Sequence, residues 1–317
     1  MFKRLWQTSP ELVATTVLML VVLAGAIVGL QIDPRVITGA PAWLKPAKFA
    51  VSIAIYTATL AWIFTLLPEW PRTRRIVGWA TAAALVIEML IIGGQAWRGT
   101  TSHFNASTPL DGVLWVIMGL AIVAQTLLSV TVAVALWKQR FHDAALGWAL
   151  RLGMTLTIVG AFTGGLMTRP TTAQLEAARA GERMTIAGAH TVGGVDGGPG
   201  MAGTGWSREH GDLRVPHFVG LHAVQALPVF ALLLRRRRLA DQARVRLVIV
   251  AATSYATLFA ILLVQALRGV PVVAPDTTTM VQLAVWVVAM ALALVLVRLR
   301  PDLHASTSTV NPPGAAT

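Results

Sequence analysis

The chain has 317 residues, of which 55% are apolar and 13% are charged, and its mean hydropathy is +0.66. Because a soluble domain carries about a quarter charged residues, this composition excludes an ordinary soluble protein and indicates a membrane protein. The net charge of +12 does not indicate a nucleic-acid partner, since the basic residues lie mostly beside apolar runs. The absence of cysteine excludes disulfides, thiolate metal sites and a cysteine nucleophile.

Apolar runs of about 20 residues, long enough to cross a bilayer, recur along the chain. They predict an all-α polytopic membrane protein with one eight-helix transmembrane domain over residues 1–300. The first run is too long for the core of a signal peptide, so we expect it to be an uncleaved span. Residues 301–317 are expected to form a disordered cytoplasmic tail. The expected spans are 12–31, 47–67, 76–97, 112–136, 143–166, 216–234, 247–267 and 279–297.

The basic residues predict the orientation of these spans. With the N-terminus in the cytoplasm, fifteen Lys and Arg residues fall on the inner side, whereas the short outer segments hold five. This bias predicts a cell-membrane protein with both termini cytoplasmic. The polar connections 32–46, 98–111, 167–215 and 268–278 then lie outside, so we expect a ligand to arrive from the extracytoplasmic side.

The second span carries a polar stripe of Lys45, Lys48, Ser52, Tyr56 and Thr59, which follow one another at steps of three and four residues. This spacing places the five side chains on one helical face. The stripe predicts a ligand-binding surface that begins at Lys45 and Lys48. The alternative is that the lysines extend to the membrane surface and the smaller residues only pack between helices.

The third span carries Glu88 near the middle of the bilayer, with Gln95 and Arg98 above it on nearly the same face. A carboxylate at this depth must be protonated or paired. Arg151 in the fifth span is the expected partner of Glu88. The pair would either fix helix packing or leave Glu88 as a proton-titrating catalytic carboxylate below an outer site, where Gln95 and Arg98 would bind ligand.

Two outer connections contain histidines. In 98–111, Thr108 and Asp111 predict a capping box for the next span, which leaves His103 as a metal-ligand candidate or a solvated side chain. The connection 167–215 begins with a capping box and continues as a glycine-rich stretch. This stretch is either a flexible linker or an ordered lid, and its His190 and Asp196 favour the lid.

The segment 209–228 is continuous with the sixth span. It places Arg214, His217 and His222 at increasing depth from the outer surface, with Gln225 on the same face as His222. Gly220 allows close helix contact, and a proline at 228 predicts a kink just beneath His222. Because ionisable groups inside a membrane are costly, His217 and His222 are expected catalytic groups, and Arg214 and Gln225 are expected to bind ligand. The alternative is that both histidines only hydrogen-bond neighbouring helices.

Three strings, LKPAKF, RGTTSHFN and GDLRVPHFVGLHAVQALP, resemble a group of bacterial multi-pass membrane proteins with no established activity. The resemblance is spread over most of the chain. It implies a multi-pass membrane fold and supplies neither a catalytic residue nor a cofactor.

Three functions fit these patterns. The first is a membrane redox enzyme with a divalent metal or a single haem, because histidine is the commonest metal ligand. The second is a proton-coupled carrier or sensor for a small anionic solute, without a cofactor, and the third is a membrane assembly or scaffold protein. The oligomeric state does not follow from the sequence. The expected metal ligands of the first function are His103, His210, His217, His222 and Asp212.

Overall fold

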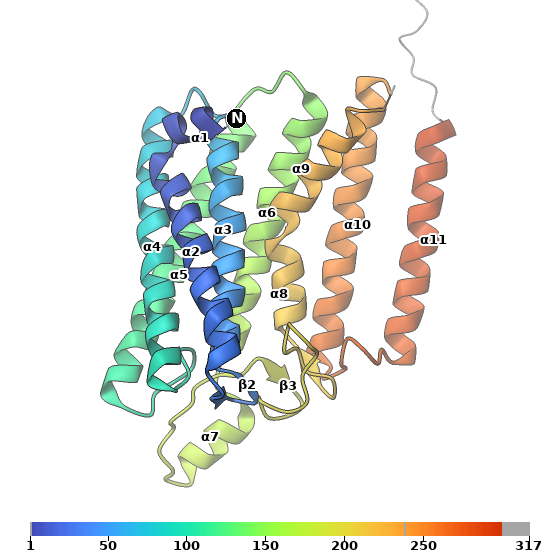
Figure 1. The fold of residues 1–317 in the computed structure, drawn as a ribbon. Helices are drawn as coiled ribbons and strands as arrows, with labels where there is room; N and C mark the ends of the chain where they lie inside the picture. The colour runs from blue at the N-terminus through green and yellow to red at the C-terminus, as the bar shows by residue number, and fades with distance from the viewer. Residues whose placement is uncertain (1, 238, 300–317) are drawn as a thin grey trace, which may run out of the picture.

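The computed structural model describes residues 2–237 and 239–299. Over these residues it is a bundle of long helices with small hairpins at one end (Figure 1). A short helix, α1 (Phe2–Thr8), precedes the bundle. Seven of the described helices are long and apolar enough to cross a membrane. They are α2 (Pro10–Ile32), α3 (Leu44–Phe64), α4 (Pro71–Arg98), α5 (Pro109–Lys138), α6 (Ala144–Met167), α10 (Asp241–Leu267) and α11 (Thr277–Leu299).

The expected sixth span is broken. It consists of α8 (Arg214–Leu221) and α9 (Ala223–Leu234), which meet at His222 with a bend of 45°. Counted as one span, the pair brings the total over the described residues to eight, so the predicted helical membrane fold is confirmed. The break falls at His222 itself, whereas the proline at 228 predicted it just beneath that residue.

Helix boundaries follow from the local sequence. Thr108 caps α5 by accepting a hydrogen bond from the backbone N–H of Asp111, as the capping box predicts. Asp143 caps α6 in the same way, through Leu146 N. Helix α4 ends at Arg98, and the φ of 75° at the following Gly99 lies in the left-handed region that favours glycine.

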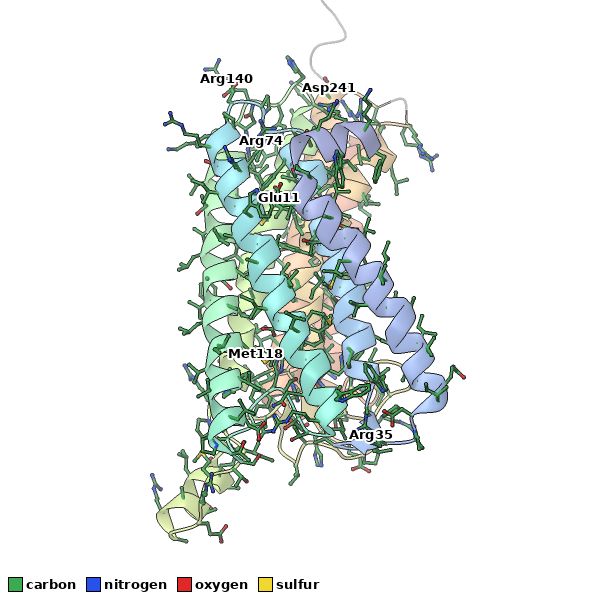
Figure 2. The ribbon with its side chains drawn as sticks, turned by 60° about the vertical axis from the view of Figure 1, so that its left-hand side comes forward. Glu11, Arg35, Arg74, Met118, Arg140 and Asp241 are labelled. Atoms are coloured by element: carbon green, nitrogen blue, oxygen red, sulfur yellow. The ribbon has the colours of Figure 1, made fainter. Side chains whose placement is uncertain are left out.

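The N-terminus and the end of α11 lie at the same end of the bundle, opposite the hairpins (Figure 1). We call these the N-terminal end and the loop end. Arg74, Arg140 and Asp241 lie toward the N-terminal end, whereas Arg35 lies at the loop end (Figure 2). The expected disordered tail, 301–317, falls outside the described residues.

The loop end is folded rather than extended. Strands β1 (Val36–Ile37) and β2 (Ala40–Pro41) form one antiparallel hairpin. The long connection holds α7 (Thr172–Arg179), with the predicted capping box, and then β3 (Thr191–Val192) paired antiparallel with β4 (Gly211–Asp212). Between β3 and β4 a further bridge joins Gly200 to Ser207.

The helices form two halves that meet along one seam. Helices α2 to α5 pack with one another, and α6 packs with α8, α9 and α10, while α5 and α6 join the halves. Toward the N-terminal end the seam is filled by one buried apolar cluster drawn from both halves. Its members include Leu60, Phe64, Leu136, Leu150, Leu227 and Ala231.

Candidate functional site

The turn between α4 and α5 carries His103 into the bundle. Phe104 adopts φ 61°, an unusual left-handed conformation for a bulky residue, and its side chain is buried. The turn is held by Asn105, whose side-chain amide donates to Thr101 O at 2.9 Å. The His103 ring then lies against the rings of Phe49 and Trp115 on two different helices. A connecting residue is therefore placed inside an aromatic pocket.

His103 stands between a lysine and a carboxylate. Lys45 Nζ lies 3.0 Å from His103 Nδ1, and Glu88 Oε1 lies 3.7 Å from His103 Nε2. Because an ammonium group only donates, Nδ1 accepts from Lys45, so a neutral His103 carries its proton on Nε2, facing Glu88. The Glu88 side chain is 2% exposed. The three residues form an acid–base chain from α3 through the turn to α4.

His190 belongs to the glycine-rich connection and is paired with a carboxylate. Its Nδ1 lies 2.8 Å from Asp196 Oδ2, and the backbone N–H of Thr191 donates to the same carboxylate. Burial raises the pKa of Asp196, but the hydrogen bonds from His190 and Thr191 outweigh it and hold the pKa below its ordinary value. Burial also lowers the pKa of His190. Nδ1 of neutral His190 therefore donates to Asp196, and Nε2 keeps its lone pair.

His217 in α8 is oriented by α6. Its Nδ1 lies 2.9 Å from the carbonyl oxygen of Gly160, which can only accept. Thr163 Oγ1 donates to the same carbonyl. The two helices approach so closely here that a Cβ added to Gly160 would lie 2.5 Å from Gly220 Cα. This confirms that Gly220 allows close helix contact, and it leaves Nε2 of His217 with a free lone pair.

The pKa of His103 depends on its burial and on three neighbouring basic groups. Burial lowers that pKa most, and the positive charges of Lys45, His190 and His217 lower it further. His103 is therefore neutral at pH 7. Phe104 also lies against the rings of both His103 and His190. We call the following six residues, from five segments, the histidine cluster: Lys45, Glu88, His103, His190, Asp196 and His217.

The glycine-rich connection is fastened over the histidine cluster by two cations. Lys48 Nζ donates to Thr204 O at 2.7 Å, and the Arg214 guanidinium donates to Gly205 O at 2.7 Å. Arg214 also forms a salt bridge of 2.6 Å with Asp212, whose side chain is fully buried. Lys48 and Arg214, expected to bind ligand, thus hold the connection in place, in line with an ordered lid.

The expected pair of Glu88 with Arg151 is wrong. The Arg151 guanidinium donates to the backbone oxygens of Leu136 and Gln139 and lies against the rings of Trp137 and Trp148. These partners satisfy the Arg151 charge at the junction between the end of α5 and the start of α6, and Glu88 is not among them. Carbonyl oxygens and aromatic faces are sufficient partners for a guanidinium.

Gln95 and Arg98 also have partners other than a ligand. Arg98 forms a salt bridge of 2.7 Å with Asp111, and Gln95 donates to the same carboxylate at 2.8 Å. Arg98 additionally donates to Gln95 Oε1. This network ties the loop end of α4 to the first turn of α5, so it supports the turn that carries His103.

The expected metal ligands do not form a donor set. No group of three or more His, Cys, Asp and Glu side chains that could hold a metal ion occurs among residues 2–237 and 239–299. Asp212 is taken by Arg214, and His210 packs against Gly194 in the lid. His222 lies at the helix break, and the structure gives its side chain no hydrogen bond among the described residues.

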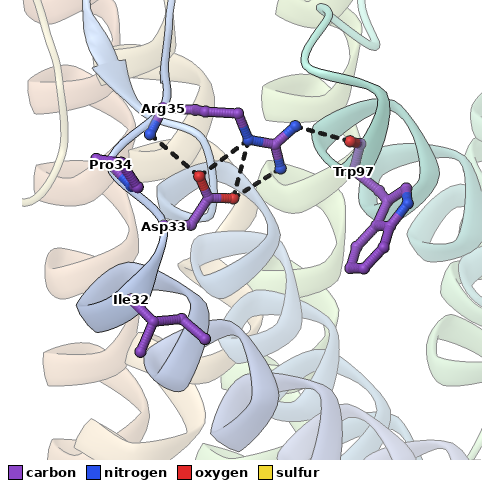
Figure 3. Close-up of a pocket in the computed structure, with 5 residues that line it drawn as sticks. All are labelled: Ile32, Asp33, Pro34, Arg35 and Trp97. Carbon is purple, nitrogen blue, oxygen red and sulfur yellow. Dashed lines mark hydrogen bonds and ion pairs between the residues drawn. The ribbon is translucent and has the colours of Figure 1, made fainter.

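A separate open pocket lies at the loop end of α2 and is lined by Ile32, Asp33, Pro34, Arg35 and Trp97 (Figure 3). Its charges are already matched: Arg35 forms a salt bridge of 2.7 Å with Asp33 and donates to Trp97 O. The hydrogen bonds and charge of Arg35 hold the pKa of Asp33 below its ordinary value. Arg35 therefore links the end of α2 to α4, and the charged side chains that line the pocket are paired with each other.

Sequence reasoning missed the contribution of α6. Thr157 Oγ1 donates to Leu221 O and accepts from Val224 N, so it satisfies backbone groups on both sides of the helix break. Thr157, Gly160 and Thr163 follow one another at steps of three. This stripe of small and polar residues is typical of membrane helix contacts and was the available signal.

Comparisons with known proteins do not assign the chain to a family. No protein-family description, no curated protein and no solved structure matches the chain. The long apolar helices show the coarser part of the resemblance, a multi-pass helical membrane protein.

Proposed function

We propose that this integral membrane protein binds a small anionic solute, together with a proton, at the histidine cluster. The observation that carries the proposal is the buried chain of Lys45, His103 and Glu88, in which a cation, a neutral imidazole and a carboxylate lie in sequence. We further propose that both termini are cytoplasmic, so that the cluster faces outward in the cell membrane.

The charge balance of the cluster supports the coupling of an anion to a proton. Around the neutral histidines, the basic side chains of the cluster and of the connection that covers it are Lys45, Lys48 and Arg214. The carboxylates are Glu88, Asp196 and Asp212, so the charges cancel when all six groups are ionised. A monoanion that enters this buried region would leave one uncompensated negative charge, which is costly in a medium of low dielectric constant. Protonation of Glu88 removes that charge.

The histidines supply the groups that an anion needs. Nε2 of His190 and Nε2 of His217 have no hydrogen-bond partner among the described residues. When a histidine takes up a proton, Nε2 becomes a charge-assisted donor to an anion. Protonation in the cluster therefore both restores neutrality and creates donors, which gives the proton a direct role in binding.

A thermal-shift experiment on the purified protein tests the proposal, since a ligand that binds the folded state raises the melting temperature. The probes are chloride, inorganic phosphate and acetate, at pH 6 and pH 8. We expect at least one of these anions to stabilise the protein, and more at pH 6 than at pH 8. Lys45→Met should abolish this stabilisation, whereas Lys138→Met, at an exposed position of the N-terminal end, should retain it.

If no anion stabilises the wild type, or if both lysine variants lose the effect equally, the proposal is wrong. The alternative function is a metal- or haem-dependent redox centre, favoured by the two unengaged Nε2 atoms of His190 and His217. It has less support, because the expected metal ligands do not form a donor set among the described residues. An absorption spectrum and metal analysis of the purified protein test it directly.

A further inference from the structure

The polar stripe of α3 continues far below the histidine cluster, along the seam between the two halves. Tyr56 Oη lies 3.1 Å from Ser129 Oγ and accepts from Gln125 Nε2 at 2.9 Å. One turn deeper, Thr59 Oγ1 accepts from Gln225 Nε2 at 3.5 Å, a link between α3 and α9 across the seam. At helical rise, Thr59 lies about 20 Å from Lys45 along α3.

Three buried acceptor oxygens mark the same region. Glu88 Oε2, Gln125 Oε1 and Gln225 Oε1 are buried and have no hydrogen-bond partner among the described residues. Buried polar atoms are nearly always satisfied, and leaving one unsatisfied costs about 1–3 kcal/mol. Such atoms are retained where water or a polar ligand can reach them. They occur here on α4, α5 and α9, the helices that surround the stripe.

The polar region ends abruptly at the helix break. His222 and Gln225 lie at the 45° bend between α8 and α9, opposite Thr59. Beyond them the buried apolar cluster closes the seam, with Leu60 and Phe64 on α3 at 1% and 0% exposure. Polar side chains of α3, α5 and α9 therefore occur between the loop end and the break, and the buried apolar cluster fills the seam toward the N-terminal end.

We propose that the seam is the route of the anionic solute and that Thr59, His222 and Gln225 form a second binding station at its closed end. This inference rests on the proposed function and makes the protein a carrier rather than a sensor. The Gln225 side-chain amide and the ring N–H of His222 can donate to an anion, beside the Thr59 hydroxyl, which donates to Ile55 O and accepts from Gln225. Broken membrane helices supply such sites because they need irregular backbone only where it lines a cavity.

The natural absence of cysteine makes a direct test available, since a single introduced cysteine is the only thiol. Thr59→Cys and Gln225→Cys are treated, in proteoliposomes, with membrane-impermeant thiosulfonate reagents that are either anionic or cationic. Only a thiol in contact with water ionises and reacts. Lys48→Cys and Val195→Cys, at the loop end, are the reactive controls, and Val195 is 88% exposed. Ile55→Cys and Val229→Cys, on outward-facing helix surfaces, are the controls expected not to react.

We expect Thr59→Cys and Gln225→Cys to react. The ratio of the rate with the anionic reagent to the rate with the cationic reagent should be higher for these two variants than for Val195→Cys. The inference is overturned if they react no faster than Ile55→Cys while Lys48→Cys reacts, or if the cationic reagent is favoured. The thermal-shift assay on the wild type reports separately whether the outer cluster binds anions. If anions stabilise the wild type but Thr59→Cys and Gln225→Cys do not react, the proposed function stands and the proposed route along the seam is wrong.

Discussion

Arg151 shows that a partly buried charge in a membrane helix need not pair with an opposite charge. Its guanidinium is satisfied by two backbone carbonyls and stacks on aromatic rings, whereas Glu88 faces Lys45 and His103. Counting residues along two helices gives their depths but not which way each face is turned. The sequence therefore predicted that both charges are buried in the bundle, but it could not predict their partners.

This arrangement predicts independent effects for the two charges. Glu88→Gln and Arg151→Gln each remove interactions with different partners, so their free-energy changes of unfolding should add within about 0.5 kcal/mol. The measurement is chemical or thermal unfolding of both single variants and the double variant in one detergent. Recovery of stability in the double variant would show that Glu88 and Arg151 interact after all.

His103 predicts a pH dependence of stability. Its pKa is lowered in the folded protein, first by burial and then by Lys45, His190 and His217, so the folded state keeps it neutral. The unfolded chain takes up the proton below a pKa of about 6.5. The stability contributed by neutral His103 is therefore complete above that pH and is lost as the pH falls toward the folded-state pKa, at up to about 1.4 kcal/mol per pH unit.

His103→Gln removes this titration, so its unfolding free energy should fall less steeply than that of the wild type between pH 7 and pH 5. His142→Gln, which replaces a histidine between α5 and α6 at the N-terminal end, is the matched control for the loss of an imidazole outside the cluster. Equal slopes for wild type and His103→Gln would show that folding does not lower the pKa of His103.

At the scale of elements, the close packing of α6 on α8 positions His217. Gly160→Ala would place a Cβ 2.5 Å from Gly220 Cα, so the helices must separate. Overpacking of this kind costs about 1–3 kcal/mol. We expect Gly160→Ala to lower the melting temperature and to weaken anion binding, because His217 Nδ1 is held by the Gly160 carbonyl. Gly165→Ala is the control, since nothing lies within 4 Å of its added Cβ.

The Thr157 hydroxyl should stabilise the helix break between α8 and α9. Thr157→Val keeps the side-chain shape but removes the hydrogen bonds to Leu221 O and from Val224 N. An unsatisfied buried backbone group costs about 1–3 kcal/mol, so the variant should unfold more readily. Thr157→Ser retains the hydroxyl and should stay close to the wild type. If Thr157→Val is as stable as Thr157→Ser, the hydroxyl does not support the break.

The elements also show what the sequence could predict. Span positions and the caps at Thr108 and Thr171 follow from apolar length and local hydrogen bonding, and both are present. The entry of His103 into the bundle depends on a left-handed Phe104 and on an aromatic pocket from two helices. The folding of the lid depends on Lys48 and Arg214, which lie elsewhere in the chain. Contacts between distant segments of this kind leave no local pattern.

At the scale of the whole molecule, the orientation is open to a simple test. The bias of basic residues predicts that the lid lies outside and that the connection before α10 lies in the cytoplasm. Reporter fusions at Thr191 and at Gln242 should therefore report opposite sides, with Thr191 outside. If Thr191 reports the cytoplasm, the histidine cluster faces inward and the solute must be offered from that side.

The central claim is that the protein binds an anion together with a proton at the histidine cluster. Isothermal titration calorimetry, with the best anion from the thermal-shift screen, measures this coupling when repeated at pH 7 in two buffers of different ionisation enthalpy. We predict that wild type takes up about one proton per anion bound, as linkage requires for one compensated charge. Glu88→Gln should still bind the anion but take up almost none. Binding without proton uptake in wild type, or unchanged uptake in Glu88→Gln, would contradict the claim.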